Sequence, residues 1–351
     1  MSVDKVIISG IQQIGIGNND VYRTWDWYRK NLSMDVPIFD EAAEAALMLP
    51  YTGGEPRSRH AILALNMLGG AGAEIWQYTT REGQASEQEL KYGDLGINVA
   101  VYKSKNIEKS HKHLSKDSPC SPILEYVDDR RSFYSKDLDG NLIRLVESDD
   151  WFQGGQSHCG GVYGAAIGVS DMDESMRFYK EILGYDQVLD EKKIKLHAFL
   201  PGDNNASYHS VILTHSNQRS GAFSPLLGRS EIELVQCLDR EPVQIFKDRM
   251  WGDLGYIHLC FDINGMAALR SKCRSNGCPF TVDSGDFDMG EAAGQFAYIE
   301  DPDGTLIEFV ETHRVPILKK IGWYLNLRKR HPEKPLPRWM LKAMGLNRKK
   351  G

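Results

Sequence analysis

The chain carries an internal repeat in which its second half resembles its first. Three segments of the first half recur in the second: 13–17 recurs at 164–168, 93–96 at 252–255, and 137–143 at 301–307. A repeat of this length determines the architecture before any local feature does. The sequence therefore predicts two similar domains, over 1–150 and 162–313, with a linker over 151–161 and a tail over 314–351.

Each predicted domain contains two copies of the same series of elements. Amphipathic segments predict helices near 21–31, 106–114, 172–183 and 265–276, and β-branched or aromatic runs predict strands at 61–65, 74–78, 211–214 and 257–261. Asp139-Gly140 and Asp303-Gly304 lie between apolar runs and predict hairpin turns, because glycine accepts a positive φ at little cost. The expected fold class is α+β, with four βαβββ modules.

Composition narrows the class of protein. A chain of 351 residues is long enough for two domains, each with its own core. No apolar run approaches the roughly 20 residues needed to cross a bilayer. The six cysteines include no C-x-x-C pair, and the first residues do not resemble a signal peptide. We therefore expect a cytoplasmic protein with reduced thiols.

The charge of the chain is unevenly distributed. The net charge is −6, but the tail over 314–351 has 12 Lys and Arg against the single acid Glu333, a charge of +11, which leaves −17 for the remainder. An acidic body argues against a nucleic-acid partner. Basic residues and apolar clusters alternate in the tail, a pattern that can bind anionic membrane surfaces. Docking of the tail on the acidic body, or an oligomer contact, is the simpler expectation.

Two motifs connect the modules to a known family. The helix end FYKEILG at 178–184 and the closing segment DPDGTLIE at 301–308, together with the four modules, resemble the vicinal oxygen chelate superfamily. That superfamily includes glyoxalase I, extradiol dioxygenases, methylmalonyl-CoA epimerase and bleomycin-resistance proteins. The resemblance covers 7–313 and implies paired modules that form two glyoxalase-like domains with cupped mixed sheets. It also implies a divalent metal held in a cup by side chains from four strand positions.

Those four positions predict a metal site in the second domain. Transferred one by one, they fall on Gln13 and Gly164, Trp76 and Glu233, Val99 and His258, and Arg144 and Glu308. In each pair the first residue lies in the first half of the chain and the second residue in the second half. Glu233, His258 and Glu308, all in the second half, have side chains that bind metals, so they are the predicted ligands. Each interrupts an apolar strand, where a buried carboxylate needs a compensating charge. Oxygen and imidazole donors suit Zn, Mn, Fe, Ni or Mg. Gln13 is expected to be structural.

Two further side chains are candidates for substrate binding. Tyr298, on the strand before the closing hairpin, could donate a hydrogen bond to a substrate oxygen, and His209 could reach inward in place of the ligand that Gly164 lacks. Tyr134 and His60 occupy the equivalent places in the first domain. Shared structural roles therefore stay open for both candidates.

Three functions remain open. Two carboxylates and one histidine resemble the glyoxalase and epimerase branch, which implies a lyase or isomerase that moves a proton in a small oxygenated substrate, with Glu233 or Glu308 as base. An extradiol-type dioxygenase is the second possibility, although Gly164 stands where that group has a histidine. A protein that binds a small molecule without turnover is the third. Substrate choice is expected to depend on the loops at 203–208 and 216–229, and a homodimer is possible.

Overall fold

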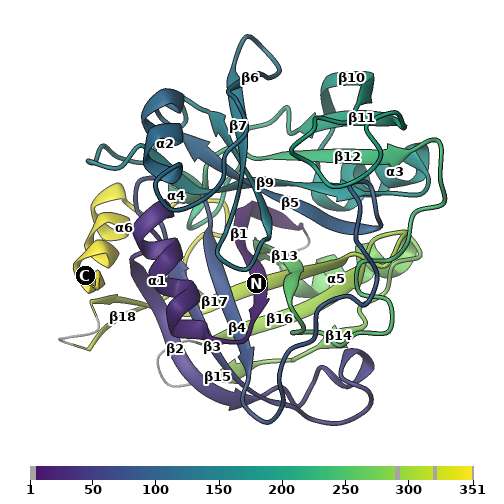
Figure 1. Ribbon diagram of the computed structural model, residues 1–351. Coiled ribbons are helices and arrows are strands. Elements are labelled where there is room, and N and C mark those ends of the chain that lie inside the picture. Colours follow the sequence, from purple (N-terminus) through teal and green to yellow (C-terminus); the bar gives the residue numbers. More distant parts are fainter. Residues whose placement is uncertain (1–4, 289–292, 319–321, 350–351) are drawn as a thin grey trace.

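The protein was studied as a computed structural model, which describes residues 5–288, 293–318 and 322–349. Two curled mixed sheets dominate it (Figure 1). Sheet A has the order β14 (Val282–Asp283), β16 (Ala293–Glu300), β17 (Leu306–Leu318), β13 (Gly255–Asn264), β1 (Ile7–Asn18), β4 (Gly72–Tyr78), β3 (Ser58–Leu65) and β2 (Val36–Glu44), with β15 (Phe287–Asp288) beside β16 and β18 (Trp323–Asn326) beside β17. Sheet B has the order β10 (Gln187–Lys195), β11 (Ser207–Thr214), β12 (Glu231–Cys237), β9 (Cys159–Gly168), β5 (Gly96–Ser104), β8 (Leu142–Glu147), β7 (Arg131–Lys136) and β6 (Leu124–Glu125).

The α+β class and the four modules are confirmed, but the modules pair differently from the predicted domains. Sheet A joins the first module to the fourth, and sheet B joins the second to the third. The connecting pairs are antiparallel, β1 with β13 and β5 with β9. The segments 1–150 and 162–313 therefore do not correspond to the two sheets, because each sheet takes strands from both. The predicted linker is also shorter, since β9 begins at Cys159.

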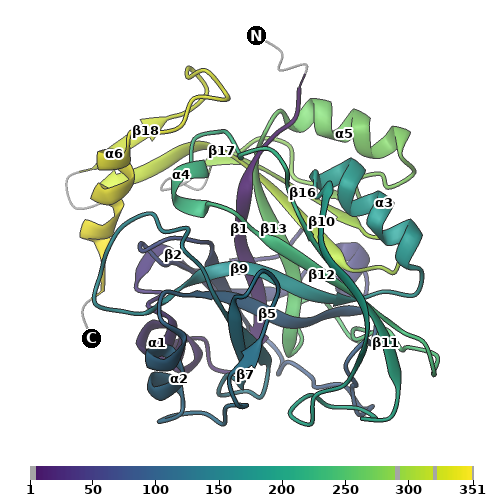
Figure 2. The same ribbon diagram turned by 90° about the horizontal axis from the view of Figure 1, so that it is seen from above.

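The predicted module helices are confirmed to within one residue at each end. They are α1 (Val21–Leu32), α2 (Ile107–Leu114), α3 (Met172–Leu183) and α5 (Met266–Ser275); shorter helices are η1 (Leu49–Tyr51), α4 (Ser224–Leu227), α6 (Arg338–Met344) and η3 (Gly345–Asn347). Asp20 caps α1 by accepting from the Arg23 amide, and Asp171 caps α3 in the same way at Glu174. The α1 and α2 helices lie side by side, as do α3 and α5 (Figures 1 and 2).

The hairpin aspartates connect the helices to the sheets. Tyr28 of α1 donates a 2.8 Å hydrogen bond to Asp137, at the turn between β7 and β8, and Tyr179 of α3 donates a 3.0 Å bond to Asp301, at the turn between β16 and β17. Both Asp-Gly turns form as predicted, with positive φ at Gly140 and Gly304. Tyr28 thus joins α1, which follows β1 of sheet A, to a hairpin of sheet B. Tyr179 joins α3, which follows β9 of sheet B, to a hairpin of sheet A. One apolar core therefore runs between both sheets and their helices.

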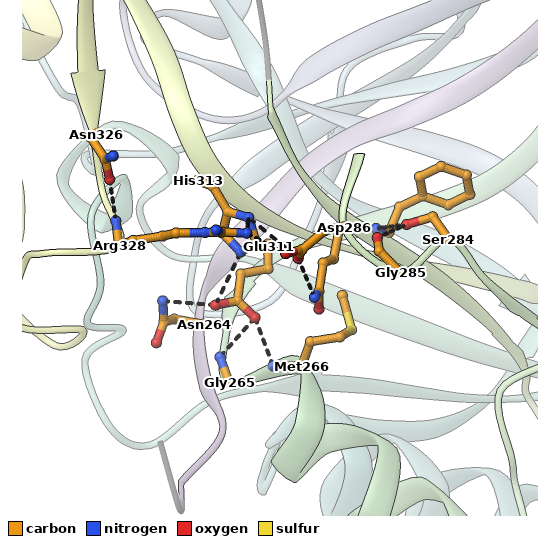
Figure 3. A network of polar contacts seen from close by, with 12 residues as sticks. Asn264, Gly265, Met266, Ser284, Gly285, Asp286, Glu311, His313, Asn326 and Arg328 are labelled. Carbon is orange, nitrogen blue, oxygen red and sulfur yellow. Dashed lines mark hydrogen bonds and ion pairs between the residues drawn. The ribbon is translucent and has the colours of Figure 1, made fainter. Parts of the chain in front are cut away.

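The tail docks on the body. The β18 strand pairs with β17, and Leu341 and Met344 of α6 are buried in an apolar cluster with residues of β2, β3 and α4. Arg328, just after β18, donates a 2.6 Å hydrogen bond to Asp286 and lies 2.9 Å from His313 of β17 (Figure 3). The expected docking is thus observed. No helix in the described part of the chain is long and apolar enough to span a membrane.

Candidate metal centre

Four polar side chains converge on the curled face of sheet A, which we call cup A. They come from four adjacent strands: Glu308 from β17, His258 from β13, Gln13 from β1 and Glu74 from β4. Successive residues of a strand point to opposite faces. In β4, for example, Ala73 and Ile75 therefore join the helix-facing core while Glu74 points into the cup.

The donor atoms of this group lie within reach of a single ion. His258 Nε2 is 3.1 Å from Glu308 Oε2 and 3.3 Å from Glu74 Oε2. One donor atom from each of these three residues lies within 4.8 Å of the others. The amide of Gln13 donates to Glu74 Oε2 at 2.9 Å and to Glu308 Oε2 at 3.4 Å. The arrangement therefore concentrates two carboxylates, one imidazole and one amide at a single point.

The electrostatics of the site follow from its burial. The His258 imidazole is inaccessible to solvent. Burial alone would lower the pKa of His258, but the charges of Glu308 and Glu74 outweigh it and raise that pKa to about 9. Burial raises the pKa of Glu74, whereas its close contact with the positive charge of His258 lowers that pKa more. In the absence of a metal, the imidazolium form of His258 would compensate only one of the two carboxylates.

Two buried atoms, His258 Nε2 and Gln13 Oε1, would be better satisfied by a bound cation than by the ion pair alone. Neither ring nitrogen of His258 has a hydrogen-bond partner among the described residues, although Nε2 is close to both carboxylates. The same is true of Gln13 Oε1. Amide oxygen and nitrogen are nearly isosteric, so half a turn of the amide would bring Oε1 to the carboxylates. The four residues thus fit a divalent metal, with His258 Nε2 and three oxygen atoms as ligands.

A cavity of about 500 Å³ leads to this group. Its lining includes Gln13, Glu74 and Glu308, together with Trp76, Trp251 and Tyr298. The volume is within the roughly 300–1,000 Å³ range of small-molecule sites. Glu74 and Glu308 have side chains that are 11% and 9% exposed, so a molecule in the cavity would contact these two carboxylates.

The structure brings together only two of the three predicted metal ligands. His258 and Glu308 lie in cup A, but Glu233 lies on β12 in the curled face of sheet B, which we call cup B. There the Glu233 carboxylate is 2.6 Å from Arg144 Nη2 and accepts a 2.8 Å hydrogen bond from Ser210. The charge of Glu233 is thus compensated by arginine. Glu233 was predicted as a ligand and base beside His258 and Glu308, and this prediction is wrong because Glu233 lies in the other cup.

Cup B is a closed counterpart of cup A. Arg144 occupies the β8 position that corresponds to Glu308, and it also donates to Tyr134 at 3.1 Å. Tyr92, Val99 and Ala166 belong to the apolar cluster that fills the rest of this face. The guanidinium supplies the positive charge that a metal would supply in cup A.

Glu74 is the candidate ligand that the sequence transfer missed. Glu74 pairs with Gly15 across β4 and β1, and Glu233 pairs with Ala166 across β12 and β9. Since Gly15 and Ala166 are 151 residues apart, as in the repeat, Glu74 is the true counterpart of Glu233, and Trp76 lies two residues further along the same face. A usable signal existed, because Glu74 interrupts an apolar strand just as Glu233 does.

The two predicted substrate-binding residues have different positions. The Tyr298 ring lies edge-on to His258, with centroids 5.5 Å apart, and lines the cavity. His209 instead lies 3.0 Å from Glu191 of β10, one residue before Ser210, which faces cup B. Its counterpart His60 makes the same kind of contact with Asp40 at 2.8 Å. His209 is therefore far from the metal centre in the fold and shares its pairing pattern with His60.

Comparison with known proteins agrees with this architecture. Residues 155–309 match the family model described as Glyoxalase/Bleomycin resistance protein/Dioxygenase superfamily. No curated protein sequence is similar enough to count as a match. Among solved structures, a proposed dioxygenase from Bacillus subtilis subsp. subtilis str. 168 is similar with a TM-score of 0.54 and 15% identity, over 87% of this chain and 86% of that one.

Variants of a plant enzyme have a similar fold. Two variants of glyoxalase I from Zea mays each give a TM-score of 0.51, at 12% and 13% identity; the alignments cover 88% and 87% of this chain, and 92% and 94% of theirs. At such identities the likeness concerns the fold alone. The family model thus matches residues 155–309, and the solved structures show a similar fold over most of the chain.

Proposed function

We propose that this protein is a divalent-metal-dependent enzyme that moves a proton within a small oxygenated substrate, as a lyase or an isomerase. The observation that carries the proposal is the convergence of Gln13, Glu74, His258 and Glu308 at one end of a cavity. The donor set is compatible with Zn, Mn, Fe, Ni or Mg. When bound, such an ion would stabilise negative charge that develops on a substrate carbonyl oxygen.

The residues of the chain supply the acid and base functions. Glu308 is the proposed base, because its carboxylate borders the cavity and can accept a proton from a bound molecule. Glu74 takes the second carboxylate role that the sequence assigned to Glu233. Burial, with the charges of Glu308 and Glu74, raises the pKa of Tyr298 well above its ordinary value. Tyr298 therefore remains a protonated donor that can hold a substrate oxygen.

The donor set favours proton transfer over extradiol oxygenation. Non-haem iron oxygenases typically use two histidines and one carboxylate. The group in cup A instead has one histidine, two carboxylates and one amide.

Binding without turnover is the second candidate function. The observation in its favour is the contact of His258 with both Glu74 and Glu308, because an imidazolium can hold the two carboxylates together without a metal. The cavity would then serve as a binding site alone.

Hydrogen–deuterium exchange distinguishes the two functions. Metal-loaded protein would be incubated in D₂O with a panel of α-hydroxy and α-oxo carbonyl compounds, and deuterium uptake at carbon would be followed by mass spectrometry. We expect metal-dependent uptake that falls at least about 100-fold in Glu308→Gln, while that variant keeps its metal. Glu233→Gln, the control from cup B, should keep the exchange. Ligand binding with no metal and no exchange would support the binding function instead.

A further inference from the structure

The cavity in cup A is more apolar than metal chelation requires. Away from the metal centre, its wall includes Leu63 and Leu65 of β3, Leu226 and Leu227 of α4, and Val315 and Met344 at the tail. Beyond Glu74 and Glu308, the charged residues in the described lining are Glu44, Arg59 and Arg314. Arg59 already donates to the Glu41 backbone at 3.2 Å and to its carboxylate at 3.4 Å.

Two additions to the module plan build this wall. The α4 helix lies within the long connection between β11 and β12, whereas the corresponding connection in the first module, between β3 and β4, is only residues 66–71. The tail adds the far end of β17 and α6, which pack with α4 in one apolar cluster. Figure 2 shows both α4 and α6 near β17, and they share an apolar cluster with Val315 and Ile317 of that strand. Cup B, closed by Arg144 and Glu233, shows that the fold itself does not require an open apolar chamber.

We propose that the substrate of this site has an oxygen-bearing chelating end and an apolar alkyl or aryl body that lies against β3, α4 and the tail. The chelating end rests on the proposed function, whereas the apolar body rests on the wall alone. Burial of apolar surface is favourable in proportion to its area, at about four-fold in affinity for each buried methylene. A phosphate-bearing or peptidic substrate would instead need several polar partners along the wall.

A series of n-alkyl hydroxamates tests the proposal, because the head chelates metals and the chain reports on the wall. Isothermal titration would give Kd for aceto-, hexano- and decanohydroxamate, below their micelle concentrations, with zinc-loaded and metal-free protein. We expect affinity to rise about four-fold per methylene until the cavity is filled. Val310, two residues beyond Glu308 and in the cavity lining, gives the test variant. Val310→Asn should weaken decanohydroxamate at least ten-fold and leave acetohydroxamate unchanged.

The control and the contrary outcomes separate the two proposals. Val188→Asn changes a 44% exposed valine of β10, in the other sheet, and should leave both affinities unchanged. Equal Kd values for the three hydroxamates, with acetohydroxamate bound only to the zinc-loaded protein, would contradict the proposed apolar body of the substrate. The same result would still support the metal centre. If affinity rises with the length of the alkyl chain but does not depend on zinc, the apolar body of the substrate is supported and the metal-dependent function is contradicted.

Discussion

His258 determines the charge balance of the metal-free site. Its pKa of about 9 in the folded protein is above the ordinary value of 6.5, because the carboxylates of Glu308 and Glu74 outweigh burial. A raised pKa contributes stability that is complete below pH 6.5 and is lost as the pH rises through about 9. We therefore expect the free energy of unfolding of the metal-free protein to fall between pH 6.5 and 9, by up to about 3 kcal/mol.

Chemical denaturation at the two pH values measures this fall. His258→Gln, which cannot titrate in this window, should show a clearly smaller decrease. An equal decrease in the variant would assign the pH dependence to other groups.

Gly15 leaves the space that the His258 ring occupies. A Cβ atom at Gly15 would lie 2.5 Å from His258 Cε1 and 2.7 Å from both ring nitrogens. Gly15→Ala should therefore displace the imidazole and weaken metal binding by about 10- to 100-fold, as loss of ligand orientation does elsewhere. Gly154→Ala is the control, since a Cβ there meets nothing within 4 Å. Competition with a chelator measures both affinities, and unchanged metal binding in Gly15→Ala would argue against His258 as a ligand.

At the scale of elements, the β8 and β12 strands of cup B depend on a buried ion pair. Arg144 and Glu233 have side chains only 4% and 5% exposed. Removal of one partner leaves an uncompensated buried charge, so Arg144→Met should lower the free energy of unfolding by about 3–5 kcal/mol. The double variant Arg144→Met/Glu233→Met should recover most of that loss, because it leaves no buried charge.

Urea denaturation of the wild type and the three variants, including Glu233→Met, gives the coupling free energy. Additive effects of the two single changes would contradict a direct role for the pair. All variants should retain the metal of cup A, which contains neither residue.

The sequence predicted the positions of helices and turns better than it predicted which strands and side chains lie together. Helix positions and Asp-Gly turns follow from local rules, namely apolar periodicity and the positive φ of Gly140 and Gly304. The candidate ligands His258 and Glu308 were predicted from their positions in the family resemblance, with support from the apolar strands that they interrupt. Glu74 was not predicted, although it also interrupts an apolar strand, because the α4 insertion changes the spacing before β12 and shifted the alignment by two residues. A shift of two residues keeps a side chain on the same face of a strand, so Trp76 was matched to Glu233 instead.

At the scale of the whole molecule, the order of the repeats did not determine which modules share a sheet. Four similar modules can pair as neighbours or as the first with the fourth, and their first strands have the same apolar pattern in both arrangements. The observed choice brings β1 beside β13, and it is this pairing that completes the metal centre with Gln13 and Glu74. The donor set therefore depends on contacts that no local pattern in the sequence specifies.

This pairing predicts that neither half of the chain folds as a monomer. If the chain is divided between Gly154 and Gly155, in the connection before β9, each fragment keeps only half of each sheet. We expect each separate fragment to lack a cooperative thermal transition as a monomer, and the co-expressed fragments to assemble into a one-to-one complex with one. Sedimentation and circular dichroism would measure this. A cooperatively folded monomer of 1–154 would contradict the observed strand pairing.

The proposed function requires a metal in cup A and none in cup B. The most direct measurement is X-ray diffraction from crystals of the untagged protein at energies above and below the absorption edge of the metal that it carries. We predict one strong anomalous peak per chain, surrounded by Gln13, Glu74, His258 and Glu308, and none beside Glu233. The absence of a peak in cup A of protein that has been supplied with Zn, Mn, Fe and Ni, or a peak in cup B, would contradict a metal centre in cup A.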